Sequence, residues 1–248
     1  MNRESTIWIV ILFLLFLVSL FLNLGSYPLY LEEPRRALIA LEMIYRDNMW
    51  VPTQIGELYF KKPPMYNWII MLGYKVFGYS EWGVRFFSVI SYIGMGLLTF
   101  FAGKKYVNLR FGLISAGLFL VSINTFFYFS TIGEIDLFYS LITLASFYVF
   151  FYFIEKGQPW PAYILFYLLS FIGVMTKGFP TLVFIAITLL TYVIHKKRFG
   201  ELFRMPNITG FLLMASLIAA YVFIYIQYAP VSGLIDGLWQ QSRGVDPV

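Results

Sequence analysis

The stretch Lys61–Lys75, KKPPMYNWIIMLGYK, decides how this chain threads through a membrane. Its uncharged part, Pro63 to Tyr74, is only twelve residues long and begins with two prolines. A helix needs about 20 mostly apolar residues to cross a bilayer, so this piece is too short. We interpret it as a helix lying in or along the outer membrane interface, where its tyrosines and tryptophan suit an aromatic belt.

The composition on either side of this stretch is that of a membrane protein. The 248 residues are 60% hydrophobic and 21% aromatic, and only 12% are charged. A soluble domain of this size would need far more polar surface. The net charge of +5 does not indicate nucleic acid, because the basic residues are spread over short loops rather than along one element. The absence of cysteine excludes disulfides and thiolate metal sites.

Gaps between charged residues predict the membrane spans. The fold is therefore expected to be all-α and polytopic, with about seven transmembrane helices in one domain over residues 1–248. Residues 25–83 would form an extracytoplasmic first loop carrying juxtamembrane helices, one of them starting at Pro34. The predicted spans are Ser5–Leu31, Phe86–Gly103, Phe111–Gly133, Leu137–Ile154, Gly157–Thr176, Gly178–Ile194 and Met205–Ile235.

The distribution of basic residues sets the orientation of these spans. With the amino terminus in the cytoplasm, the basic loops at 104–110, 156 and 196–204 lie inside, as the positive-inside rule requires, and the short outer loops hold only Lys177. Counting Pro63–Tyr74 as a span would reverse every later loop. When Pro63–Tyr74 is not counted as a span, the unusual charged clusters are all predicted on the outer face.

The first two clusters lie in the first loop. Glu32 and Glu33 precede Pro34 and Arg35, which is compatible with acids stabilising a helix amino terminus, or with a carboxylate base beside a phosphate-binding arginine. Lys61 and Lys62 precede two prolines. They are either lysines that snorkel at an interfacial helix, or ammonium groups fixed by a rigid backbone to bind a lipid phosphate.

The remaining clusters lie between later spans. Glu134 and Asp136 are flanked closely by apolar helices, where ionisable groups usually have a function, although a short turn with solvated acids would look the same. The two carboxyl groups could raise one another's pKa, which would suit a base. Lys177 alone is typical of an interface anchor. His195 is the only histidine and is predicted in an inner loop, so no histidine triad or zinc site is expected.

Taken in order, these clusters resemble the amino-terminal half of the GT-C glycosyltransferases, in the branch of the lipid A aminoarabinose transferase and the protein O-mannosyltransferase-like enzymes. The resemblance rests on the acidic pair before Arg35, on Gly56–Pro64 (GELYFKKPP), on Gly78–Arg85 (GYSEWGVR), and on Ile135-Asp136 and Thr176-Lys177-Gly178. It covers nearly the whole chain, and the Lys-Pro-Pro block is its most specific motif.

The resemblance implies inverting transfer of a sugar from a polyprenyl-phosphate donor at the outer face of the bacterial inner membrane. By it, Glu32 and Asp136 correspond to the two catalytic acids and Lys62 to the lysine at the donor phosphate. Two positions depart from the pattern: Glu32 stands where Asp is usual, and Lys61 stands where the aminoarabinose branch has a Glu that helps to hold a metal. A divalent metal is compatible with the sequence but not required, and no residue is assigned to one.

The candidate site residues fall into three groups. Asp136 and Glu32 are the expected catalytic residues, Lys62, Arg35 and Lys61 the expected ligands of the donor phosphate, and Glu33, Glu134 and Lys177 secondary candidates. The acceptor would be a lipid, a glycan or a protein.

Two other functions remain open, a proton-coupled secondary transporter and a non-catalytic lipid-binding fragment. Transporter sites usually lie near the midplane on broken helices, often with internal repeats, whereas here the charges gather at one face and no repeat is evident. We also expect this sequence to be part of a longer protein, because it ends in a polar stretch soon after the last predicted span.

Overall fold

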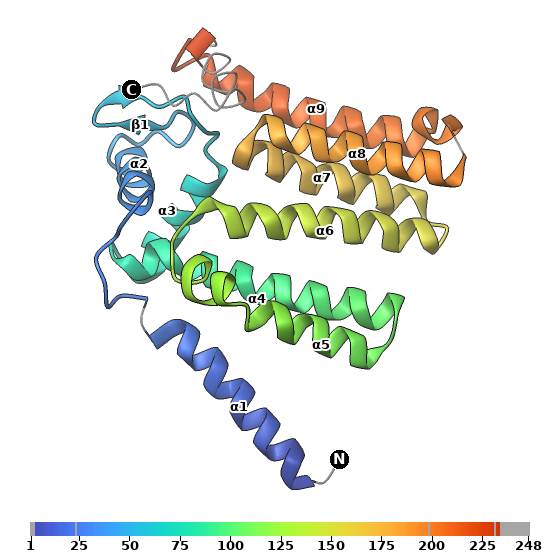
Figure 1. Cartoon of the computed structure of the whole chain (residues 1–248). Helices are drawn as coiled ribbons and strands as arrows, with labels where there is room; N and C mark the ends of the chain where they lie inside the picture. The colour runs from blue at the N-terminus through green and yellow to red at the C-terminus, as the bar shows by residue number, and fades with distance from the viewer. Residues whose placement is uncertain (1–2, 23, 198, 231, 234–248) are drawn as a thin grey trace. The chain divides into compact units, whose positions relative to one another are not determined.

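The computed structural model describes residues 3–22, 24–197, 199–230 and 232–233, which are almost entirely helical (Figure 1). The elements in chain order are α1 (Arg3–Leu22), α2 (Glu33–Tyr45), β1 (Thr53–Gln54), β2 (Glu57–Leu58), α3 (Met65–Phe77), α4 (Glu81–Tyr106), α5 (Leu109–Leu120), the π-helical η1 (Asn124–Phe129), α6 (Ile135–Glu155), α7 (Pro159–Lys177), α8 (Phe179–Lys196), the 3-10 helix η2 (Phe199–Phe203) and α9 (Met205–Tyr225).

Among the described residues, five helices are long and apolar enough to cross a membrane: α4, α6, α7, α8 and α9. The predicted class, an all-α polytopic membrane protein, is confirmed, and the count of seven spans stays a prediction. Helix α3 has 13 residues and follows the two prolines, so the stretch after Lys62 is a helix too short to cross, as the sequence indicates.

The third predicted span, Phe111–Gly133, is wrong as a continuous helix. Helix α5 ends at Leu120, and the chain resumes as η1 only at Asn124. Between them the Thr125 hydroxyl donates hydrogen bonds to the carbonyl oxygens of Phe119 (3.0 Å) and Ser122 (3.1 Å). Side chains that bond nearby carbonyls in this way compete with the regular helical ladder. Apolar length alone could not predict this break.

Local sequence explains where several of the helices begin. The side chains of Ser80 and Asn108 accept hydrogen bonds from backbone N–H groups three residues on, and so cap α4 and α5. Prolines occupy the first turn of α7, α8 and α9, where the missing N–H group costs nothing.

The chain divides into two compact units. Unit 1 comprises Met1–Ala37 and Ile69–Leu137, and unit 2 comprises Leu38–Trp68 and Phe138–Val248. The division passes through α2, α3 and α6, so each of these three helices contributes residues to both units.

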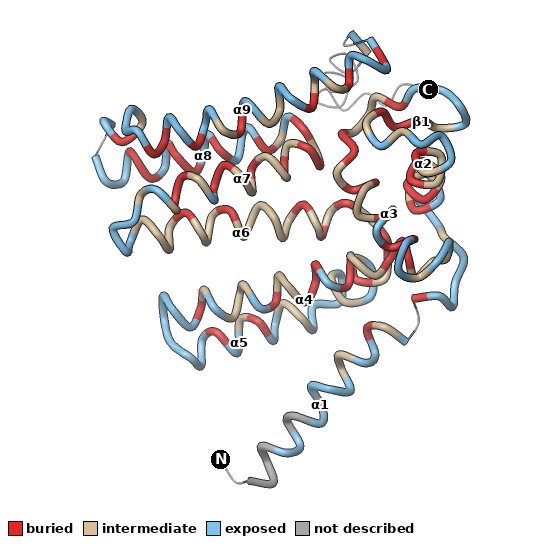
Figure 2. The backbone as a smooth tube through the Cα atoms, turned by 180° about the vertical axis from the view of Figure 1, so that it is seen from behind, coloured by how far each residue is buried: buried red, intermediate tan, exposed pale blue. Residues whose placement is uncertain are grey.

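Unit 1 is built around the packing of α4 against α5 and the end of α1. Its core holds Leu20 and Leu24 from the first segment, Val89 and Tyr92 from α4, and Leu137. Val89 and Tyr92 are fully buried, and Figure 2 shows the buried positions of α4 recurring along the helix. This spacing is that of an amphipathic helix packed on one face.

Unit 2 has an aromatic core within the bundle of α6 to α9, in which α7 packs against both α8 and α9. Phe150, Tyr163 and Phe166 are each at most 1% exposed and meet at ring-centroid distances of 5.1 to 5.3 Å. The buried Tyr167 hydroxyl donates a hydrogen bond of 2.9 Å to the Asn207 side chain, which ties α7 to α9. This bond satisfies the buried Tyr167 hydroxyl inside the bundle.

In unit 2, β1 and β2 form a hairpin that is held by Glu42 of α2. The Glu42 carboxylate accepts hydrogen bonds from the Thr53 hydroxyl (2.6 Å) and from the backbone N–H groups of Ile55 (2.6 Å) and Gly56 (3.2 Å). Burial alone would raise the pKa of Glu42, but these bonds and the nearby Arg46 outweigh it and hold the pKa below its ordinary value of 4.5.

A depressed carboxyl pKa stabilises the hairpin above the unfolded-state value near 4.5, and that contribution is lost as pH falls through the folded-state pKa. We expect the protection factors of the Ile55 and Gly56 amides, which compare the exchange rate with the intrinsic rate at the same pH, to fall on acidification in the unchanged protein. In Glu42→Gln the two amides should exchange faster already at neutral pH and respond less to acid. Glu57→Gln, at an exposed strand position, is the control, and an equal acid response in all three proteins would contradict the role of Glu42.

Candidate functional site

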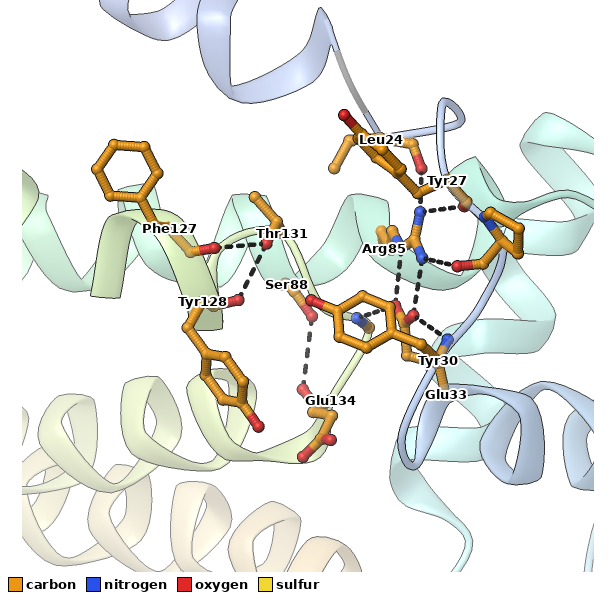
Figure 3. Close-up of polar contacts among 12 residues, drawn as sticks. Leu24, Tyr27, Tyr30, Glu33, Arg85, Ser88, Phe127, Tyr128, Thr131 and Glu134 are labelled. Atoms are coloured by element: carbon orange, nitrogen blue, oxygen red, sulfur yellow. Dashed lines mark hydrogen bonds and ion pairs between the residues drawn. The ribbon is translucent and has the colours of Figure 1, made fainter. Parts of the chain in front are cut away.

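A buried ion pair joins Glu33, the first residue of α2, to Arg85 in the second turn of α4 (Figure 3). Both side chains are buried, with 0% of Glu33 and 2% of Arg85 exposed. Arg85 Nε lies 2.7 Å from Glu33 Oε1, and Arg85 Nη2 lies 2.8 Å from Oε2. This is the bidentate geometry in which a guanidinium and a carboxylate bind most strongly.

The other hydrogen-bonding positions of the pair are also occupied. Glu33 Oε1 accepts from the backbone N–H of Gly133 at 2.6 Å, and Oε2 accepts from that of Tyr30 at 3.0 Å. Four donors thus fill the four acceptor positions that a carboxylate offers. The Arg85 guanidinium also donates to the carbonyl oxygens of Leu24 (2.7 Å), Tyr27 (2.9 Å) and Pro28 (3.0 Å). Glu33, a secondary candidate, is committed to contacts within the protein.

Glu32, the preceding residue, lies in a different environment. It forms an ion pair with Arg35, three residues on, and the side chains of Glu32 and Arg35 are 44% and 29% exposed. The structure thus brings together two residues expected to serve as base and phosphate ligand, where a substrate can reach them. Glu32 and Glu33 are adjacent in sequence, but the Glu32 side chain is partly exposed and the Glu33 side chain is buried.

Glu134 and Asp136 lie together at the start of α6, in unit 1 with Glu32. Burial raises the pKa of Glu134 above its ordinary value of 4.5, and the charge of Asp136 and a hydrogen bond to it raise it further, while Arg36 opposes the shift. Burial and the neighbouring Asp136 thus favour the protonated form of Glu134 over its charged form.

The expected phosphate-binding lysines belong to unit 2. Lys61 and Lys62 are half-buried and stand directly before the two buried prolines that precede α3. Lys177 ends α7, and its ammonium lies 5.0 Å from the centre of the Tyr139 ring, a cation–π contact. Convergence of these lysines with the acids of unit 1 stays a prediction.

The residues offer no evident place for a metal. Within the described ranges, there is no group of three or more His, Asp, Glu or Cys side chains that could hold an ion. Lys61 also stands at the position where a metal-binding acid was expected from the resemblance.

Sequence reasoning missed Arg85, Gly133 and Ser88. Arg85 carried a usable signal, because an arginine within an apolar span is expensive and usually has a partner. Gly133 donates to Glu33 across 100 positions of sequence, and Ser88 donates its hydroxyl to the carbonyl oxygen of Glu134 at 3.4 Å. Neither contact can be predicted from the residues that lie near it in the sequence.

The fold is shared with a protein of known structure. The crystal structure of ArnT from Cupriavidus metallidurans bound to undecaprenyl phosphate matches with a TM-score of 0.81 at 19% identity, over 95% of this chain and 45% of that chain. The apo structure of the same protein matches with a TM-score of 0.77, over 90% of this chain and 42% of that chain.

Two curated relatives share one name. An undecaprenyl phosphate-alpha-4-amino-4-deoxy-L-arabinose arabinosyl transferase of Pseudomonas savastanoi pv. phaseolicola is 33% identical over 195 residues, which are 76% of this chain and 36% of that protein. A protein of the same name from Aeromonas salmonicida is 31% identical over 222 residues, 88% of this chain and 40% of that protein. The chain therefore spans about two fifths of the length of these relatives.

A family model described as dolichyl-phosphate-mannose-protein mannosyltransferase matches residues 61–226, from the lysine pair through the end of α9. This match and the relatives confirm the resemblance drawn from the charged clusters. The chain belongs to the dolichyl-phosphate-mannose-protein mannosyltransferase family of integral-membrane GT-C glycosyltransferases.

Proposed function

We propose that this protein transfers a sugar from a polyprenyl-phosphate donor to an acceptor hydroxyl or phosphate, with inversion, at the outer face of the bacterial inner membrane. The observation that carries the proposal is the family match over residues 61–226. The names of the relatives, which specify an undecaprenyl phosphate-linked sugar, support this class of donor.

The transfer needs one group to accept a proton. For a hydroxyl acceptor, a carboxylate takes the proton as the acceptor oxygen bonds to the anomeric carbon from the face opposite the phosphate. The bond from that carbon to the phosphate oxygen breaks, and the polyprenyl phosphate leaves with the electron pair. Asp136, paired with a Glu134 of raised pKa, suits the role of base. Glu32 is the alternative, since its side chain is partly exposed.

The transfer also needs positive charge where the phosphate departs. Lys62 and Lys61 stand against rigid prolines, and fixed cations stabilise developing negative charge without reorganisation. Arg35 would join them, and a phosphate that draws Arg35 away from Glu32 would free the Glu32 carboxylate at the same time. Lys177 is a further cation for this site, and Glu33 serves as a support.

The test is transfer from defined donors by the purified complete protein in lipid nanodiscs. Undecaprenyl phosphate carrying aminoarabinose, mannose or another labelled sugar is supplied with lipid, glycan and protein acceptors. We expect consumption of at least one donor, with free undecaprenyl phosphate and a glycosylated acceptor as products.

The two other functions predict different outcomes in matched preparations. Proton-coupled uptake into proteoliposomes, without donor consumption, would establish the transporter. Donor binding without turnover under all conditions would indicate a non-catalytic lipid-binding protein. Either result would overturn the proposal.

A further inference from the structure

The segment that carries Glu134 and Asp136 is hydrogen-bonded to α2 and to α4, and it packs closely against α4. The Gly133 N–H donates to Glu33 Oε1 at 2.6 Å, and the Ser88 hydroxyl donates to the Glu134 carbonyl oxygen at 3.4 Å. A Cβ atom at position 133 would lie 2.5 Å from Val84 Cγ1 and 2.8 Å from the Val84 carbonyl oxygen. Since that oxygen belongs to the α4 backbone, it has little freedom to move, and only glycine fits at position 133.

The same Glu33 carboxylate also fixes the first loop. It accepts from the Tyr30 N–H, and its partner Arg85 holds three carbonyl groups of the loop between α1 and α2. Glu32 is the residue next to Glu33, and Asp136 is three residues after Gly133. One buried ion pair therefore links the two segments on which the candidate acids stand.

From this geometry we infer that Glu33, Arg85 and Gly133 are positioning residues, which set Asp136 at a fixed distance and angle to Glu32. Figure 3 shows Glu33 and Arg85 between the loop after α1 and the segment of Glu134. The inference rests on the proposed function, in which one of these acids takes the acceptor proton. It gives Glu33 a positioning role, in which Glu33 holds the two segments together.

Fold stability alone gives little reason for an ion pair at this place. Replacing a buried pair by apolar side chains of similar size is often neutral or stabilising. The pair instead fixes a single arrangement of the two segments, because each N–H group of the Arg85 guanidinium and each acceptor position of the Glu33 carboxylate is occupied by a partner. Such an arrangement matters for transfer, since a misplacement of about 1 Å can cost about 100-fold in rate.

The decisive variant is Gly133→Ala, with Gly117→Ala as its matched control. A Cβ atom at Gly117 in α5 would meet nothing within 4 Å, so this change adds the same methyl group without a clash. We expect Gly133→Ala to lower kcat by about 100-fold while KM for the donor changes far less. The pH dependence of kcat should also differ from that of the unchanged protein, because the carboxyl groups of Glu134 and Asp136 would be displaced together. Gly117→Ala should retain the unchanged protein's kcat and pH profile.

A second measurement does not depend on activity. These 248 residues contain no cysteine. With every cysteine outside them replaced by serine, spin labels on Glu32→Cys and Asp136→Cys report the distance between the two segments alone. We expect a narrow distribution that broadens or shifts in Gly133→Ala and stays narrow in Gly117→Ala. If the protein transfers no sugar at all, the proposed function fails, and this distance still tests the positioning role.

Ser88→Ala provides a milder disturbance if Gly133→Ala does not fold. It removes the bond to the Glu134 carbonyl without adding an atom, and we expect a smaller fall in kcat with KM unchanged. A folded Gly133→Ala with the kcat, pH profile and label distance of the unchanged protein would overturn the inference. So would a Ser88→Ala protein that shows no change in any of these when Gly133→Ala cannot be obtained.

Discussion

Asp136→Asn is expected to reduce transfer by about 100- to 10,000-fold, the usual contribution of a positioned general base. Asparagine has nearly the volume of aspartate and can still hydrogen-bond Glu134, so the start of α6 should keep its structure. It cannot take up the acceptor proton. The loss should therefore appear in kcat, while binding of undecaprenyl phosphate stays close to that of the unchanged protein.

The control for this substitution is Asp47→Asn. Asp47 is exposed after the end of α2 and has a φ of 49°, a conformation that asparagine adopts readily. The turnover of the Asp47→Asn protein should stay near that of the unchanged protein. Glu32→Gln tests the alternative base: a severe loss there, with activity retained in Asp136→Asn, would transfer the role to Glu32.

Lys62→Ala tests the other half of the same mechanism. Removal of a cation from the departing phosphate should lower kcat severely and also weaken binding of the donor. Near-normal transfer by both Asp136→Asn and Lys62→Ala would refute the assignment of the site. A severe loss in both would support the assigned roles of proton acceptor and phosphate ligand.

The sequence predicted the helical elements well because apolar length and charge are local properties. The prolines before α3 and the short apolar run after them correctly indicated a helix that cannot cross. The break between α5 and η1 was missed, because it depends on side-chain bonds of Thr125 that apolar length does not reveal.

The site was predicted less completely than the helices. A span bounded by charged residues stops at Arg85, so the sequence predicts that this span starts at Phe86. The structure shows Arg85 inside α4, buried against a carboxylate 52 positions away. Composition also could not separate Glu32 from Glu33, since what distinguishes them is a partner remote in sequence.

Arg85→Met is expected to lower the free energy of unfolding by about 3 to 5 kcal/mol, the usual cost of removing one partner from a buried ion pair. Methionine fills much of the space but leaves the Glu33 charge buried without its partner. It also leaves the carbonyl groups of Leu24, Tyr27 and Pro28 without the donors they have now. The measurement is unfolding by increasing SDS in mixed micelles, followed by the helical signal.

The control is Arg110→Met, which removes an exposed arginine from the first turn of α5 and should change stability by no more than about 0.5 kcal/mol. Glu33→Gln completes a double-mutant cycle. Its amide NH2 would face two donors in place of a carboxylate oxygen, so it should also destabilise the protein. Once Arg85 is gone, the second substitution removes an unpaired charge, so the double variant should be less destabilised than the sum of the two single changes. Additive effects, or an Arg85→Met protein as stable as Arg110→Met, would mean that the ion pair does not join the two segments.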